Sequence, residues 1–110
     1  MGDTTIEKHA EAIMANVDPE AGVGIGIAEL LVLLPLLFNL PCFNAADPEA
    51  RRRQVERHPN LSRLLLAGQL RKHNQSLTKK QAFAVADSAI DHMVSSSPAE
   101  LAAFCAACAA

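Results

Sequence analysis

The longest apolar stretch of the chain, residues 21–43, constrains the fold more than any other feature. It reads AGVGIGIAELLVLLPLLFNLPCF and carries one charged side chain, that of Glu29. A bilayer is crossed by about 20 apolar residues, so this stretch is long enough to span a membrane. A helix that is apolar on all sides can equally form the centre of a small helical bundle. The segment can therefore be interpreted either as a membrane span or as the central helix of a bundle.

Some features of the stretch favour a membrane span over residues 21–43. Gly22 and Gly26 have the spacing that lets membrane helices approach closely. Acidic residues precede the stretch and three arginines, residues 51–53, follow it. This order predicts an N-terminus outside the cell and a C-terminus in the cytoplasm. In this alternative, residues 47–110 form a basic helical domain in the cytoplasm.

Other features favour a core helix in a bundle. Glu29 would lie inside the hydrocarbon at a cost of about 2–3 kcal/mol, and the chain has no Trp or Tyr to mark a membrane interface. The flanking segments are amphipathic, and their apolar faces need a partner. The sequence therefore predicts an all-α fold. We expect one domain over residues 1–110, located in the cytoplasm, with five to six helices around a central apolar helix at about 27–40, kinked at Pro35.

The expected helices on either side are marked by local start signals. Capping boxes begin at Thr4, Thr78 and Ser97, where a hydroxyl residue is followed three positions later by Glu or Gln. Glycines 22, 24 and 26 predict a loosely wound start of the central helix. Periodicity places apolar side chains on the core face of helices 61–72 and 78–94. The residues on these faces are Leu61, Leu64, Leu65 and Gly68 in the first, and Ala82, Phe83, Ala86, Ala89, Ile90 and Met93 in the second.

The charges of the chain are segregated although the net charge is only −2. Residues 1–46 carry one lysine and six acidic residues, whereas residues 47–80 carry nine of the ten basic residues and three acidic ones. This pattern suits self-association or an acidic partner, and Arg51, Arg52, Arg53 and Arg57 could also contact phosphates. Because aromatic residues for base stacking are absent from this segment, any nucleic-acid binding should be weak and independent of sequence.

Residue types that could carry chemistry do not form a recognisable catalytic pattern. Cys105 and Cys108 could bind zinc with Cys42 and His92, but no second pair with ligand spacing supports such a site. Asp87 lies one helical turn before Asp91 and His92 in the predicted helix 78–94. The sequence supplies neither a cleft nor a further group that would complete an acid–base site with them. We therefore expect neither an enzyme nor a metal or other cofactor.

The sequence favours a small helical interaction or assembly subunit that acts through apolar helix faces. Its expected partner is another protein or a second copy of itself, while a membrane or nucleic acid remain alternatives. Glu29 should find a buried partner, with Arg63, Arg71 or a neighbouring subunit as candidates. The candidate interaction residues are Gly22, Gly26, Glu29, Phe38, Phe43, Arg51, Arg52, Arg53 and Arg57.

Overall fold

Local capping signals in the sequence position the last two helices of the chain. The Thr78 hydroxyl accepts a hydrogen bond from the Gln81 amide, and the Gln81 side chain accepts one from the Thr78 amide. Ser97 and Glu100 make the same reciprocal pair of bonds. Both capping boxes are therefore confirmed. The box at Thr4 stays a prediction, because that residue is the first that the structure describes.

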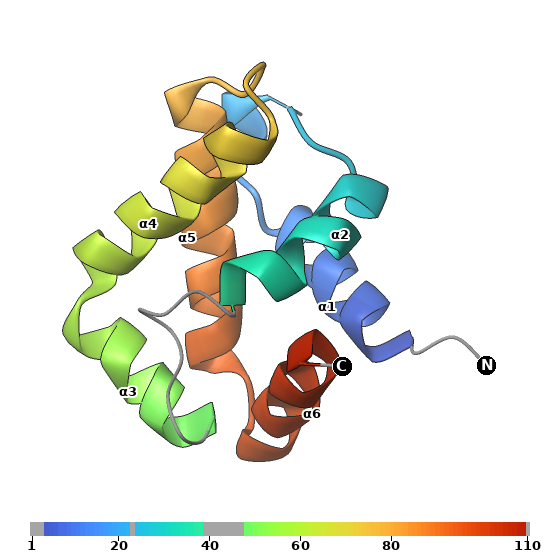
Figure 1. Ribbon diagram of the computed structural model, residues 1–110, viewed down its shortest axis with the longest axis vertical. Coiled ribbons are helices and arrows are strands. Elements are labelled where there is room, and N and C mark those ends of the chain that lie inside the picture. The colour runs from blue at the N-terminus through green and yellow to red at the C-terminus, as the bar shows by residue number, and fades with distance from the viewer. Residues whose placement is uncertain (1–3, 23, 39–47, 110) are drawn as a thin grey trace.

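The computed structural model describes residues 4–22, 24–38 and 48–109, which are helical and contain no strand (Figure 1). The all-α class is confirmed. The elements are α1 (Thr4–Ala15), the 3₁₀ turn η1 (Pro19–Ala21), α2 (Ile27–Phe38), α3 (Pro48–Arg57), α4 (Pro59–His73), α5 (Lys79–Ser95) and α6 (Pro98–Ala109).

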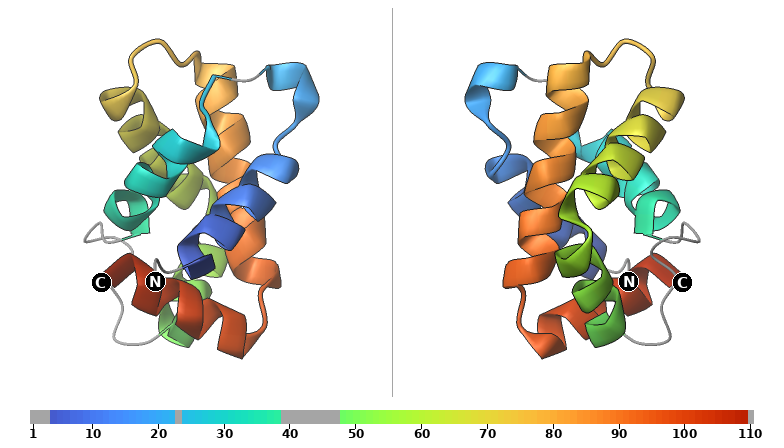
Figure 2. Two further views of the ribbon diagram at one scale, coloured as in Figure 1. Left: turned by 90° about the vertical axis from the view of Figure 1, so that its right-hand side faces the viewer. Right: turned by 90° about the vertical axis from the view of Figure 1, so that its left-hand side faces the viewer.

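The 17-residue helix α5 runs along the long axis of the molecule (Figure 1), and the other elements pack around it or around its neighbours. The helices α4 and α5 form an antiparallel hairpin, while α1 packs against a different side of α5 (Figure 2). The helix α6 lies across one end, where it contacts α1, α2 and α3 (Figures 1 and 2). The radius of gyration is 12.8 Å, close to the value of about 13 Å expected for a compact chain of this length.

All six helices contribute to one hydrophobic core. Ser88 on α5 also ties α1 to the core, because its hydroxyl donates a buried hydrogen bond of 2.5 Å to the Ile13 carbonyl oxygen. The largest side chains that are fully buried are Ile13, Leu30, Leu34, Leu66, Leu70, Leu77, Met93, Leu101 and Phe104.

The apolar helix α2 is buried on one side rather than all round. Leu30, Leu33 and Leu34 enter the core, whereas Val32 is 67% exposed. The predicted helix 27–40 is observed to residue 38 and continues through Pro35; residues 39 and 40 lie outside the described part. Over the described ranges, no helix has both the length and the hydropathy of a membrane span, and α2 has 12 residues.

The glycine-containing segment before α2 is not helical, contrary to the expectation of a loosely wound helix start. The helix begins at Ile27, after all three glycines. Gly22 adopts a positive φ of 85°, a conformation that favours glycine. At Gly24 an added Cβ would lie 2.5 Å from Leu77 Cδ2. The glycines therefore provide a bend and a close approach to the start of α5.

The predicted core face of α4 is wrong for three of its four residues, whereas Leu65 is partly buried and packs against the core. Leu61 and Leu64 are 54% and 55% exposed, and Gly68 is exposed as well. The buried side chains come from a different stripe of the helix, namely Ser62, Leu66, Ala67 and Leu70. Because α4 is apolar on two sides, packing against α5 and α2 covers one side and leaves the other in solvent.

Candidate functional site

The first candidate surface is the outer face of α2. Its exposed large side chains are Val32 and Leu36, which lie one turn apart, and Ala28, one turn before Val32, is exposed as well. Ile27 is also exposed but lies on a different side of the helix start. The only charged residue of the helix, Glu29, is half-buried. The side chains of α2 that the structure shows as exposed are therefore all apolar.

Glu29 has an uncharged partner instead of one of the predicted arginines. The Asn74 side-chain amide donates to both Glu29 carboxylate oxygens, at 3.0 and 3.2 Å. Arg63 pairs with Asp87, and Arg71 donates to the Leu77 carbonyl oxygen. The bond from Asn74 joins the turn between α4 and α5 to the first turn of α2. Glu29 thus helps to fix the position of α2.

The other candidates near α2 do not form a helical contact surface. Gly22 and Gly26 both precede the helix, so their spacing of four residues creates no close-approach face on it. An added Cβ at Gly26 would meet no atom within 4 Å. Phe38 ends α2 but its side chain lies outside the described residues, as does Phe43.

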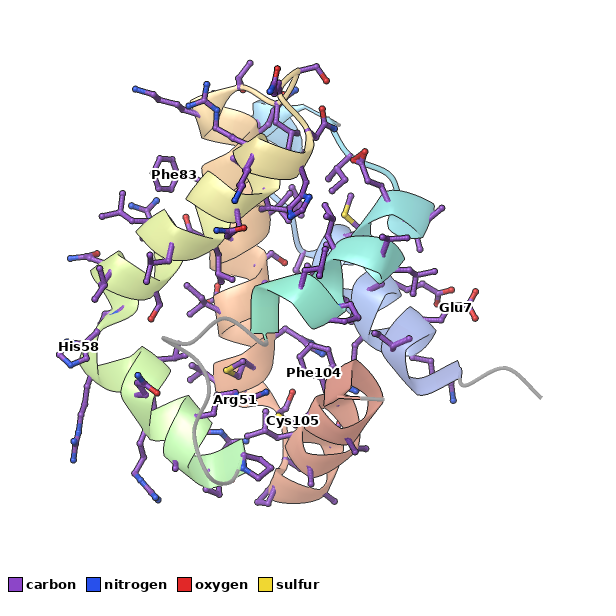
Figure 3. All side chains as sticks on the ribbon, viewed as in Figure 1. Glu7, Arg51, His58, Phe83, Phe104 and Cys105 are labelled. Atoms are coloured by element: carbon purple, nitrogen blue, oxygen red, sulfur yellow. The ribbon has the colours of Figure 1, made fainter. Side chains whose placement is uncertain are left out.

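The four arginines of α3 do not share one surface. Arg51 is buried, with 8% of its surface exposed, and its terminal nitrogen donates to Cys105 Sγ on α6 at 3.4 Å (Figure 3). Arg52 donates to the Ser96 carbonyl oxygen and pairs with Glu49 at 3.6 Å. Arg53 and Arg57 are exposed. Two of the four side chains therefore hold helices together, which reduces the surface that could contact phosphates.

Cys105 lies half-buried on α6 beside Arg51. Burial raises the pKa of its thiol, while the charge of Arg51 and the hydrogen bond from it oppose this rise. A neutral thiol is a poor nucleophile and metal ligand. The side chains of Cys42 and Cys108 lie outside the described residues. Within the described part of the chain, no three His, Cys, Asp or Glu side chains are arranged to hold a metal ion.

The residues Asp87, Asp91 and His92 are not brought together as an acid–base group. Asp87 accepts two hydrogen bonds from Arg63, at 2.7 and 3.0 Å, and Asp91 is exposed. His92 instead faces His9 on α1, with 2.5 Å between its Nε2 and His9 Nδ1. Both imidazoles pack near the ring of Phe104. Sequence reasoning missed this pair, although His9 follows Ile6 by three residues and precedes Ile13 by four, the spacing of a buried face.

The second candidate surface is a hollow of about 260 Å³ between α4 and α5. Phe83 on α5 points outward beside α4 (Figure 3), and the Arg63 guanidinium lies 4.6 Å from the centre of its ring. The exposed side chain of Leu61 lies one turn of α4 beyond Leu64. The hollow is lined by Leu64, Ala67, Gly68, Arg71, Lys79 and Phe83.

Comparison of the chain with protein-family models, with curated proteins and with solved structures gives no match. Its function is therefore inferred from the two surfaces described above.

Proposed function

We propose that the chain is a non-catalytic helical assembly subunit, and that it associates with a second copy of itself through the outer face of α2. The observation that carries this proposal is the exposure of Val32 at 67%, with Leu36 one turn later at 49%. Grouped apolar side chains of this size are seldom left in water on a monomer. Their burial against a partner stabilises the complex in proportion to the apolar area removed from water.

A second copy suits this face better than a charged partner does. In a twofold interface each face meets itself, so any charge on it would be placed near an identical charge. The exposed side chains of this face carry no such charge, and the half-buried Glu29 beside them is bonded to Asn74. The face is also small, and stable interfaces bury about 800 Å² per partner. We therefore expect a reversible dimer with a dissociation constant of about 10 μM or weaker.

Sedimentation velocity over a range of protein concentrations tests this proposal. The wild-type chain should shift from monomer to dimer as the concentration rises through the micromolar range. A Val32→Ser/Leu36→Ser variant should remain monomeric at the same concentrations. Both positions are exposed, so the variant should keep its helix content by circular dichroism and lose only about 1 kcal/mol of stability.

The matched control is Leu64→Ser, which removes an equally exposed apolar side chain from α4. This variant should dimerise like the wild type. The proposal fails if the wild-type chain is monomeric up to about 1 mM, or if the α2 variant dimerises as strongly as the control.

A further inference from the structure

The outward face of α4 differs from that of α2 in its charge. Leu61 and Leu64 lie exposed along α4, and the helix has no acidic residue along its whole length. Gly68 sits in the lining of the hollow, and an added Cβ there would meet no atom within 4 Å. The glycine therefore leaves room for another backbone to come close to α4.

Cations surround this apolar strip at both ends. Arg71, Lys72, Lys79 and Lys80 are exposed near the turn that joins α4 to α5. Arg71 is held at the edge of the hollow by its hydrogen bond of 3.3 Å to the Leu77 carbonyl oxygen. Arg57 is exposed just before the other end of α4. The nearby carboxylate of Asp87 is already paired with Arg63. The exposed cations around the strip outnumber the exposed carboxylate of Glu56 beside Arg57, which favours a positive field there.

We propose that this α4–α5 surface binds an acidic amphipathic helix of a partner protein. Apolar side chains of the partner, spaced at i, i+3 and i+7, would cover Leu61, Leu64 and Phe83. Acidic side chains at its edges would lie near Arg57 and near the cations at the α4–α5 turn. Pairing of this surface with the same surface of a second copy would bring like charges together, so the twofold association proposed for α2 does not extend to it. The inference stands independently of the association through α2.

An acidic helix fits the surface better than a nucleic acid or an anionic membrane does. Phosphates would satisfy the lysines and arginines but would leave the exposed leucines in water. The aromatic ring that borders the hollow, Phe83, already has the Arg63 guanidinium on one face, which obstructs base stacking from that side. A partner that carries apolar and acidic side chains at neighbouring positions can cover the leucines and pair with the cations at the same time.

Fluorescence anisotropy with a labelled synthetic peptide tests this inference. The probe is a helical peptide of about 15 residues with leucines at i, i+3 and i+7 and glutamates on both flanks. A second peptide carries lysine in place of each glutamate. The full-length chain should bind the glutamate peptide at least about 10-fold more tightly than the lysine peptide. Raising the salt concentration from about 0.05 to about 0.5 M should weaken the binding of the glutamate peptide.

Variants of the chain separate the apolar part of this surface from its charged part. Leu64→Ser should weaken peptide binding about 10-fold, and Lys79→Glu should weaken it to a similar degree. Gly68→Gln should block the hollow without removing any side chain, so it serves as a second variant should Leu64→Ser perturb the fold. The Val32→Ser/Leu36→Ser variant should bind the peptide like the wild type, even though it no longer dimerises.

Two results would overturn the inference. One is equal binding of the glutamate and lysine peptides, or binding that Leu64→Ser and Gly68→Gln leave unchanged. The other is tighter binding of a DNA duplex or of phosphatidylserine vesicles that Lys79→Glu abolishes and Leu64→Ser leaves unchanged, because that result would assign the surface to phosphates. Neither result bears on dimerisation through α2, which sedimentation measures separately.

Discussion

His9 and His92 meet between α1 and α5, where their contact is partly buried. The interaction between the two rings depends on which ring nitrogens carry a proton. In a neutral pair, the N–H of one ring can donate to the bare nitrogen of the other ring, across the contact between His9 Nδ1 and His92 Nε2. Desolvation lowers the pKa of His9 below its ordinary value of 6.5, the charge of a protonated His92 lowers it further, and the Glu100 carboxylate opposes both. Desolvation likewise lowers the pKa of His92, again against Glu100. The folded state therefore prefers both rings neutral.

This preference predicts a fold that loses stability as the pH falls. The imidazoles are protonated more readily in the unfolded chain than in the folded one. Their stabilising contribution to the free energy of unfolding is therefore complete above about pH 6.5 and decreases as the pH drops below that value. The urea concentration at half-unfolding should therefore fall between about pH 7.5 and about pH 5.5. Glu100 titrates below this window, because its hydrogen bonds with Ser97 lower its pKa from 4.5.

The variant His92→Gln should flatten this pH dependence, because it removes one of the two coupled rings. His58→Gln, at an exposed position, should keep the wild-type dependence. An unchanged pH profile in His92→Gln would mean that the buried pair does not control it.

At the scale of whole elements, the sequence predicts the features that depend on a few consecutive residues. The Thr78 and Ser97 caps need only four consecutive residues, and both are confirmed. The buried stripe of α4 was mispredicted because Leu61, Leu64 and Leu65 form one apolar stripe and Leu66 and Leu70 another. Periodicity cannot choose between two such stripes, since the choice depends on where α5 and α2 pack. The same ambiguity concealed the candidate site on α4, because two of the leucines assigned to the core, Leu61 and Leu64, belong to its exposed surface.

Two glycines provide a matched pair of substitutions for testing how the elements pack. Gly24→Ala should cost about 1–2 kcal/mol, because the new Cβ would lie 2.5 Å from Leu77 Cδ2 and 2.7 Å from Gln81 Oε1. Gly68→Ala should instead raise stability by about 0.5–1 kcal/mol, since its Cβ enters open space within a helix. Urea unfolding monitored by circular dichroism measures both changes. A loss of stability in Gly68→Ala, or none in Gly24→Ala, would contradict the observed packing.

At the scale of the whole molecule, α2 has two functions on opposite faces: it completes the core and it presents the surface proposed for dimerisation. Leu33 and Val32 are adjacent in sequence, yet 4% of Leu33 and 67% of Val32 is exposed. Periodicity identified α2 as apolar throughout, but which side faces out depends on the placement of α1, α4 and α6, which contact it. The same substitution at these two neighbouring positions therefore separates folding from assembly.

Leu33→Asp should unfold the chain, because a carboxylate without a partner in the core costs several kcal/mol, a large part of the stability of a small domain. Val32→Asp should change stability by no more than about 0.5–1 kcal/mol but should abolish dimerisation, because a twofold interface would bring two aspartates together. Circular dichroism reports the helix content of both variants, and sedimentation reports the oligomeric state of Val32→Asp. If Leu33→Asp kept its helix content, α2 would not be packed into the core. If Val32→Asp still dimerised, the association would have to use another face of the molecule.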